Sequence, residues 1–397
     1  MRVFYALLFG IAMTGGTSLA AGVHPNGSAS ALDAGARGSV HSLAQPNASH
    51  GYKVVYAFKG GTTDGEYPYA GLTALNGALY GTTLLGGATP SGGDGTIFEL
   101  SASGTESVLY SFTGTPDGRA PAANMIAVSG ALFGTTNFGG AASSGTIFEL
   151  IAPGTESALH SFGGTPDGAV PQASLLSLNG KFYGCTNSGG AENEGTVFEL
   201  SASGKERVLY SFTGGIDGGY PYAGLILLNG KLYGTTFEGG TGDGTVFTVS
   251  ASGRERVIYN FLGNGQDGEN PQAGLVALNG KLYGTTTNGG AYGQGSVFEV
   301  STRGKERVLT SDVYAPEDGS LIVVNNALYG TSSGENYNYG NVFKVSLSGK
   351  ETVLHTFTGS KDGEYPFGSL LAVNGVIYGT TAYGGTPDFG TIFTIAP

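Results

Sequence analysis

The sequence of 397 residues has one cysteine and no tryptophan. Because Cys185 has no second thiol to pair with, an intrachain disulfide, a cysteine-based zinc site and a CxxC redox pair are all excluded. The other repeats carry Thr at the position of Cys185, so we expect the Cys185 side chain to be buried within a strand. Neither HExxH, GxSxG nor a phosphate-binding loop occurs. We therefore expect no metal and no cofactor.

Charge is scarce and unbalanced. Charged residues make up 12% of the chain, with 18 basic and 30 acidic side chains and a net charge of −12. An acidic surface without a Lys/Arg run repels phosphate backbones, which excludes nucleic acid as a partner. Glycine, by contrast, is abundant at 73 residues, and 40% of the chain is hydrophobic. This combination predicts many short strands joined by tight turns.

The N-terminus predicts export. Arg2 precedes an apolar run from Val3 to Met13, and Ser18-Leu19-Ala20 is a small-x-small cleavage motif, so residues 1–20 resemble a signal peptide. An uncleaved anchor is the alternative, although the run is short for a membrane span. Residues 21–50 contain few apolar side chains and predict a flexible, low-complexity leader. We expect a secreted, periplasmic or cell-surface protein with no membrane span in its mature chain.

Residues 51–397 consist of seven repeats. Two independent markers, an Asp-Gly pair and a Phe in the pattern G-[TSN]-[IV]-F, recur with a common period near fifty residues. Such a period, with several short strands in each unit, is typical of propeller blades. The markers are Asp64, Asp117, Asp167, Asp217, Asp267, Asp318 and Asp362, and Phe98, Phe148, Phe198, Phe247, Phe298, Phe343 and Phe393.

Each repeat predicts four strands, called a to d in chain order. In residues 217–261, an apolar run at 225–228 is followed by Asn229-Gly230 and a second run at 231–236. Asn-Gly between two apolar runs is a strong hairpin signal, because both turn residues take positive φ. Further strands are expected at 245–249 and 256–261. The four together predict an antiparallel meander.

A single meander cannot bury both faces, so neighbouring repeats must stack. The predicted fold is therefore all-β, a seven-bladed β-propeller of four-stranded antiparallel blades. The repeat domain opens with an orphan strand d at 54–58 and ends on strand c at 391–395. We expect these two strands to pair, so that the N-terminal strand completes the seventh blade and closes the ring.

The repeated residues also resemble a known family. The consensus YSF-(x)-DG-(x)-P-(x)-AGL-(x)-NG-K-LYGTT-(x)-GG-(x)-GTVFEL-(x)-SG is similar to the GloVer tandem repeat of bacterial extracellular proteins over residues 52–397. The resemblance implies export and a propeller-like repeat domain. It supplies no catalytic residue that could be transferred to this chain.

The ring is expected to have one plain end and one variable end. The a–b and c–d turns lie at one end of the ring and have nearly the same sequence in every repeat. The b–c and d–a loops lie at the other end, and their sequences differ between repeats. Variable loops on a rigid scaffold are where binding usually resides. Exposed aromatic side chains suit sugars or a protein partner, although these rings could equally cover the blades as core. The candidate ligand-binding residues in the d–a loops are Tyr67, Tyr69, Tyr220, Tyr222, Tyr365 and Phe367.

The sixth repeat departs from the pattern. Asp318 and Tyr329 are 11 residues apart, whereas the corresponding interval is 16 in the other repeats compared. Asp312 stands where the other d strands carry Phe. A shortened loop predicts a notch, bordered by Tyr337 and Tyr339, which with Asp312 complete the candidate site residues. Drift of a degenerate repeat is the alternative.

His160 and His355 occupy the strand-d position that is Tyr in other repeats, which favours a side-chain exchange over a metal ligand or base. The seven Asp-Gly pairs offer one Asp per loop, whereas calcium needs six to eight oxygens, so we interpret them as turn formers.

The function predicted from the sequence is a non-enzymatic binding module for an extracellular glycan or protein, expected to be a monomer. The alternative is a secreted propeller hydrolase or lyase acting on polysaccharide, which needs paired carboxylates. Its candidate acids are Asp312, Asp318 and Glu335. A purely structural envelope protein is the third possibility.

Overall fold

The structure is a computed structural model that describes residues 51–88, 93–151, 154–311, 313, 319–334 and 339–397. The predicted signal peptide at 1–20 and leader at 21–50 lie outside the described residues. Within the described ranges, no helix is long and apolar enough to cross a membrane.

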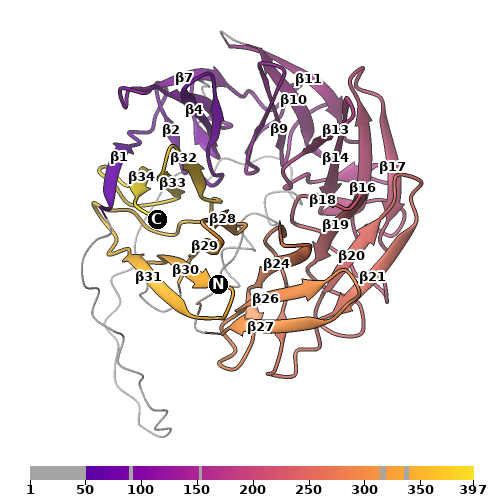
Figure 1. Ribbon diagram of the computed structural model, residues 1–397. Helices are drawn as coiled ribbons and strands as arrows, with labels where there is room; N and C mark the ends of the chain where they lie inside the picture. The colour runs from indigo at the N-terminus through magenta and orange to yellow at the C-terminus, as the bar shows by residue number, and fades with distance from the viewer. Residues whose placement is uncertain (1–50, 89–92, 152–153, 312, 314–318, 335–338) are drawn as a thin grey trace, which may run out of the picture. The chain divides into compact units, whose positions relative to one another are not determined.

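The described residues form a seven-bladed β-propeller (Figure 1). Each blade is a four-stranded antiparallel sheet whose strands follow in chain order. Blade 1 consists of β3 (Thr73–Leu75), β4 (Ala78–Thr83), β6 (Thr96–Leu100) and β7 (Glu106–Ser111). Blade 2 consists of β8 (Ile126–Val128), β9 (Ala131–Thr136), β10 (Thr146–Ile151) and β11 (Thr155–Ser161). Blade 3 consists of β13 (Leu176–Leu178), β14 (Lys181–Thr186), β16 (Thr196–Ser201) and β17 (Glu206–Ser211).

The remaining blades repeat this order. Blade 4 consists of β18 (Ile226–Leu228), β19 (Lys231–Thr236), β20 (Thr245–Val249) and β21 (Glu255–Asn260). Blade 5 consists of β23 (Val276–Leu278), β24 (Lys281–Thr286), β26 (Ser296–Ser301) and β27 (Glu306–Thr310). Blade 6 consists of β28 (Ile322–Val324), β29 (Ala327–Ser332), β30 (Asn341–Ser346) and β31 (Glu351–Thr356). Blade 7 consists of β32 (Leu371–Val373), β33 (Val376–Thr381), β34 (Thr391–Ile395) and β1 (Lys53–Ala57).

The short strand a of each blade lies nearest the ring centre and strand d lies at the rim (Figure 1). Neighbouring inner strands such as β3 and β8 contact each other. Only three residues fit in strand a, because seven strands converge there. Every c–d pair has a register shift at the same place, for example between Ile97 and Phe98 in blade 1. Such bulges increase the local twist of a strand pair.

The N-terminal strand closes the ring as predicted. β1 pairs antiparallel with β34, with Val54 opposite Phe393 and Ala57 opposite Thr391. The sheet order β1–β34–β33–β32 therefore joins the first described strand to the last three. Closure removes the exposed edges that an open stack of blades would have.

The hydrophobic core lies between the blades. Seven clusters of buried side chains occur among the described residues, one at each interface between neighbouring blades. At the interface between blades 7 and 1, Phe58 packs with Leu72, Phe98 and Ile392. Cys185 belongs to the cluster between blades 3 and 4 and is 1% exposed, as expected of a strand filler. Burial raises the pKa of its thiol.

The close approach of Phe to strand b explains the Gly in the LYGTT pattern. A Cβ on Gly81 would lie 2.4 Å from Cζ of Phe98, and the equivalent Gly of the other six blades meets its strand-c Phe in the same way. A larger residue there would displace a fully buried ring. The same two strands are joined by a hydrogen bond between the hydroxyls of Thr83 and Thr96, 2.7 Å apart.

The core between blades 5 and 6 is filled differently from the other interfaces between blades. Asp312, which the sequence places in the Phe position of strand d, lies outside the described residues. Val313, one residue later, is 1% exposed and packs with Phe343 in the cluster between blades 5 and 6. It occupies the place that Phe261 has in the preceding cluster.

Candidate functional site

The two ends of the ring are built as the sequence indicates. At one end the d–a and b–c loops pair in two-stranded sheets, formed by β2 (Gly65–Glu66) with β5 (Leu85–Gly86), β12 (Gly168–Ala169) with β15 (Ser188–Gly189), and β22 (Gly268–Glu269) with β25 (Asn288–Gly289). At the other end, the a–b turn at Asn76-Gly77 and the c–d turn at 101–104 line one groove. We call these the variable end and the plain end.

In the described d–a loops, the residue before the Pro that follows the Asp-Gly pair is held in the left-handed region. Tyr67, Tyr220 and Tyr365 have φ of 58°, 53° and 53°, and Ala120 has 53°. The strain is offset by backbone hydrogen bonds to the b–c loops of the blades on either side. Tyr67 N–H donates to the carbonyl of Phe389 at 2.9 Å, and the carbonyl of Tyr67 accepts from Leu84 N–H at 3.0 Å. The loop thereby fixes where an aromatic side chain leaves the backbone.

In each described Asp-Gly pair, the Asp side chain holds the loop against the end of strand d. Asp117 accepts hydrogen bonds from Tyr110 Oη at 2.7 Å, Thr113 N–H at 3.0 Å and Thr113 Oγ1 at 2.7 Å. Asp117 is 5% exposed. Groups of strand d and of the loop therefore supply the hydrogen-bond partners of this carboxylate.

A glutamate from the next blade faces five of these described pairs. Glu156, at the start of strand d of blade 2, lies near Asp117 and Tyr110 of blade 1. Burial and then the Asp117 charge raise its pKa to about 7. Burial raises the pKa of its equivalents to the same value, with a neighbouring Asp adding to the shift; these are Glu106, Glu206, Glu255 and Glu306.

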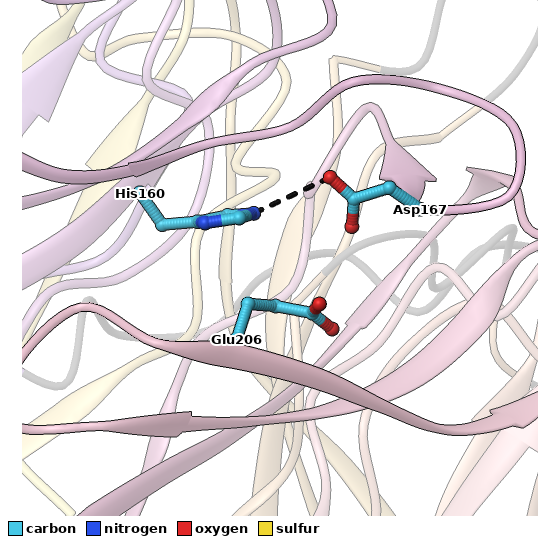
Figure 2. A group of neighbouring side chains, drawn as sticks. All are labelled: His160, Asp167 and Glu206. Carbon is cyan, nitrogen blue, oxygen red and sulfur yellow. Dashed lines mark ion pairs between the residues drawn. The ribbon is translucent and has the colours of Figure 1, made fainter.

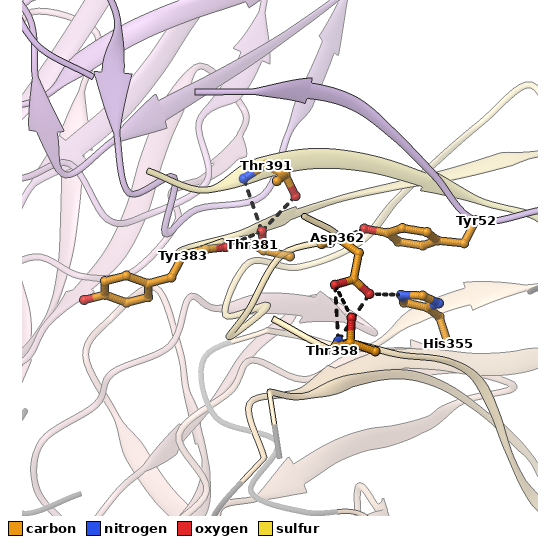
Figure 3. Close-up of polar contacts among 7 residues, drawn as sticks. All are labelled: Tyr52, His355, Thr358, Asp362, Thr381, Tyr383 and Thr391. Atoms are coloured by element: carbon orange, nitrogen blue, oxygen red, sulfur yellow. Dashed lines mark hydrogen bonds and ion pairs between the residues drawn. The ribbon is translucent and has the colours of Figure 1, made fainter. Parts of the chain in front are cut away.

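Blade 7 replaces this glutamate with Tyr52. The Tyr52 ring stacks on His355, with centroids 3.7 Å apart, and its hydroxyl donates to the carbonyl of Asp362. His355 Nε2 lies 3.3 Å from Asp362 Oδ2, so His takes the position of Tyr as predicted (Figure 3). Tyr383 points away from this group (Figure 3). The N-terminal segment therefore closes the ring with side chains as well as with β1.

Six aromatic side chains gather over blade 7 at the variable end. We call them the seam cluster: Tyr67 and Tyr69 before blade 1, Tyr365 and Phe367 before blade 7, and Tyr383 and Phe389 in the b–c loop of blade 7. All six are partly exposed. The ring centroids of Tyr67 and Tyr383 are 4.9 Å apart, those of Tyr69 and Phe367 are 4.4 Å apart, and those of Tyr365 and Tyr383 are 5.9 Å apart. The cluster is a continuous aromatic surface.

Carboxylates surround the seam cluster. Glu66 accepts a hydrogen bond from Gly61 N–H at 2.8 Å, and Asp388 accepts one from Gly384 N–H at 2.8 Å. Burial raises the pKa of Glu364, and the charges of Asp388 and Asp362 add to this effect. The hydrogen bond that Glu364 accepts from Ser360 N–H acts in the opposite direction but is outweighed. Burial also raises the pKa of Tyr383 to about 12, so the hydroxyl stays protonated at neutral pH. The surface thus offers ring faces together with both donors and acceptors.

The structure brings together only part of the predicted set. Tyr67, Tyr69, Tyr365 and Phe367 meet in the seam cluster, whereas Tyr220 and Tyr222 belong to blade 4, where Tyr222 packs on Phe237 at 5.2 Å. Tyr339 packs against the core between blades 6 and 7, and its carbonyl accepts from Tyr365 N–H at 2.9 Å. Asp312, Tyr337, Asp318 and Glu335 lie outside the described residues, and with them the predicted notch.

Sequence reasoning missed Tyr383 and Phe389. Both lie in the variable b–c loop of blade 7, whose sequence is AYGGTPDFG. The prediction from sequence named aromatic residues of the d–a loops but none of this b–c loop. The signal was available, because ring closure places the b–c loop of the last blade beside the first d–a loop. Sequence reasoning also missed a groove of about 660 Å³ at the plain end, between blades 7 and 1. Val55, Leu75, Leu100 and Tyr378 are among the residues that line it.

The fold belongs to a widely shared class. Among solved structures, a streptogramin B lyase matches with a TM-score of 0.56 at 16% identity, covering 83% of this chain and 93% of that one. Virginiamycin B lyase from Staphylococcus aureus matches with a TM-score of 0.56 at 13% identity, covering 87% and 99%. The AfRom2 CNH domain matches with a TM-score of 0.50 at 10% identity, covering 87% and 99%. At such identities the likeness shows the propeller fold alone.

The repeats identify the family. The model of the Gloeobacter/Verrucomicrobia repeat matches residues 14–243 and 238–397, and the chain belongs to this family. The resemblance read from the consensus sequence is thereby confirmed. No curated protein matches the sequence.

Proposed function

We propose that the protein is a secreted, non-enzymatic carbohydrate-binding module and that the seam cluster is its binding surface. The observation that carries the proposal is the gathering of six partly exposed aromatic rings at one place on the variable end. The apolar faces of sugar rings stack on aromatic side chains, which combine a large apolar area with a polar tip in Tyr.

The acidic border suits the same ligand. Carboxylates such as Glu66 and Asp388 accept hydrogen bonds from hydroxyl groups, and the Tyr hydroxyls both donate and accept. The net charge of −12 makes an anionic polysaccharide a poor ligand. The expected ligand is therefore a neutral glycan.

The rigidity of the loops supports a preformed site. The backbone of Tyr67 and Tyr365 is fixed by hydrogen bonds to neighbouring loops, so little conformational entropy is lost when a ligand binds. Binding needs no rearrangement of the blades.

The test compares equivalent positions in two blades. A neutral glycan is first selected on an array with the full chain, and its Kd is then measured by isothermal titration calorimetry. Tyr67→Ala and Tyr69→Ala should each weaken binding about tenfold, which corresponds to about 1.4 kcal/mol. Ala occurs naturally in both positions of the repeat, at Ala120 and Ala122, so the variants should fold.

Tyr220→Ala and Tyr222→Ala are the matched controls, because they change the same repeat positions in blade 4, away from the seam cluster. They should leave the Kd within twofold of the wild type. Equal losses in both pairs of variants, or a glycan array without any neutral ligand, would refute the proposed function.

Export is part of the same proposal and is tested separately. Cleavage after Ala20 should leave a mature N-terminus at Ala21, as determined by N-terminal sequencing of the protein recovered outside the cytoplasm. An intact Met1 on the exported protein would contradict a cleaved signal peptide.

A further inference from the structure

The interface between blades 2 and 3 differs from its equivalents. Where blades 1, 3 and 4 and the N-terminal strand have Tyr in strand d, blade 2 has His160. His160 faces Asp167 of the following loop and Glu206 of blade 3 (Figure 2). The ligand atoms of these three side chains all lie within 4.8 Å of one another. Among the described residues, no other group of three His, Cys, Asp or Glu side chains is as close.

The distances differ from those of the tyrosine interfaces. Tyr110 and Tyr210 donate to their Asp at 2.7 and 2.8 Å. His160 Nε2 lies 3.4 Å from Asp167 Oδ2, beyond a good hydrogen bond. Nitrogen and oxygen ligands held about 2.1 Å from a tetrahedral zinc ion are about 3.4 Å apart. The His–Asp spacing therefore allows both side chains to bind one metal ion, and the third ligand decides whether they do so.

Two of the three groups present unsatisfied atoms. His160 Nε2 and Glu206 Oε1 are both buried and have no hydrogen-bond partner. Such atoms are costly to bury unpaired. Asp167 Oδ2 accepts from Gly163 N–H at 2.9 Å and Oδ1 from Gly168 N–H at 2.8 Å, so the backbone orients this carboxylate.

The charge of the site also suits a cation. The carboxylates of Asp167 and Glu206 face each other across the interface, with ligand atoms within 4.8 Å of one another. A divalent ion between them neutralises both carboxylates. The side chains of His160 and Asp167 are 18% and 25% exposed, so water can reach an open coordination position.

We propose that His160, Asp167 and Glu206 form a zinc-type divalent metal site at the rim between blades 2 and 3. One imidazole nitrogen and two carboxylate oxygens are ligands that zinc accepts, and water would complete a four-coordinate site. This proposal departs from the prediction from sequence, which favoured a side-chain exchange at His160 over a metal ligand. The exchange introduces a ligand at the interface where Asp and Glu are already in place.

The chain contains its own control for this site. His355 pairs with Asp362 in the same way, at 3.3 Å, but Tyr52 stacks on it where Glu206 would be. With one carboxylate fewer, this second position should not bind zinc comparably. A histidine in strand d is thus insufficient without the glutamate from the next blade.

The experiment titrates the full chain with Zn²⁺ by calorimetry and with Co²⁺ by visible absorption. The wild type should bind one more equivalent than His160→Tyr, and the tetrahedral Co²⁺ absorption band should be lost in that variant. Tyr is the residue of this position in other blades, so the fold should persist. Glu206→Gln should weaken Zn²⁺ binding at least tenfold, whereas His355→Tyr should bind like the wild type.

The leader contains His24, His41 and His50, and these histidines are unchanged in every variant. Metal bound there cancels in the comparison. Wild-type stoichiometry and affinity in either His160→Tyr or Glu206→Gln would overturn the proposal, as would an equal loss in His355→Tyr.

Discussion

Replacing Phe58 by Ala tests whether the N-terminal strand closes the ring energetically. Phe58 follows β1 and is fully buried, at 0% exposure, although it lies only a few residues from the start of the described chain. Its ring packs edge-on against Phe98 of blade 1 at 5.1 Å and against Tyr56 at 5.2 Å. It also lies in one cluster with Ile392 of blade 7 and Leu72 of blade 1, two blades that are adjacent only because the ring is closed.

The magnitude follows from this burial. Truncating a buried Phe to Ala removes apolar contacts and leaves a cavity, at a cost of about 3–5 kcal/mol. The free energy of unfolding of a domain is only about 5–15 kcal/mol. Phe58→Ala should therefore lower the midpoint of urea unfolding substantially.

Phe212→Ala is the matched control. Phe212 has the same repeat position in the middle of the chain, is also 0% exposed, and packs on Phe247 at 5.0 Å. The two variants should lose the same stability within about 1 kcal/mol. A Phe58 variant within 0.5 kcal/mol of the wild type, beside a strongly destabilised Phe212 variant, would refute closure of the ring by β1.

Further predictions concern strand deletion, pH and packing. Deleting residues 51–58 leaves the edge of β34 unpaired and should lower the thermal midpoint by more than Phe58→Ala does; an unchanged midpoint would contradict the pairing of β1 with β34. The pKa of Glu156 is about 7 in the folded protein, above its ordinary value near 4.5, so the folded state binds the proton more tightly. Stability from this group is full below about pH 4.5 and falls as pH rises through 7. The thermal midpoint should thus be higher at pH 5 than at pH 8. Glu156→Gln should raise the thermal midpoint at pH 8 and leave it unchanged at pH 5. A lower midpoint of this variant at pH 8 would show that the ionised Glu156 stabilises the fold, contrary to the prediction. Gly234→Ala puts a Cβ 2.6 Å from Cζ of Phe247 and should cost about 1–3 kcal/mol in urea unfolding, whereas Gly163→Ala, whose nearest atom is 3.6 Å away, should cost less than 1 kcal/mol.

The sequence predicted the strands well where the repeat supplies local signals. In blade 4, the expected strands at 231–236 and 245–249 coincide with β19 and β20, because an Asn-Gly turn and a Gly-rich loop bound them. Strand a was expected one residue too early. Leu225 is buried between blades 3 and 4 but stands before the ladder pairing of β18 begins.

Contacts between blades were beyond local pattern reasoning. Glu156 follows Asp117 by 39 residues, and nothing in either segment indicates that the two carboxyl groups meet. They do so because ring packing places the start of one strand d beside the loop after the previous one. The seam cluster is a second example: the ring centroids of Tyr67 and Phe389 are 5.9 Å apart, although the two residues lie at opposite ends of the repeat domain.

Hydrogen–deuterium exchange of the full chain, with and without the selected neutral glycan, tests the location of the binding surface most directly. Binding at the seam cluster predicts slower exchange in the loops at 59–69, 358–368 and 382–390, with the a–b and c–d turns unchanged. Protection confined to the plain-end turns around 74–78, 101–104 and 373–376, which line the opposite groove, would contradict it.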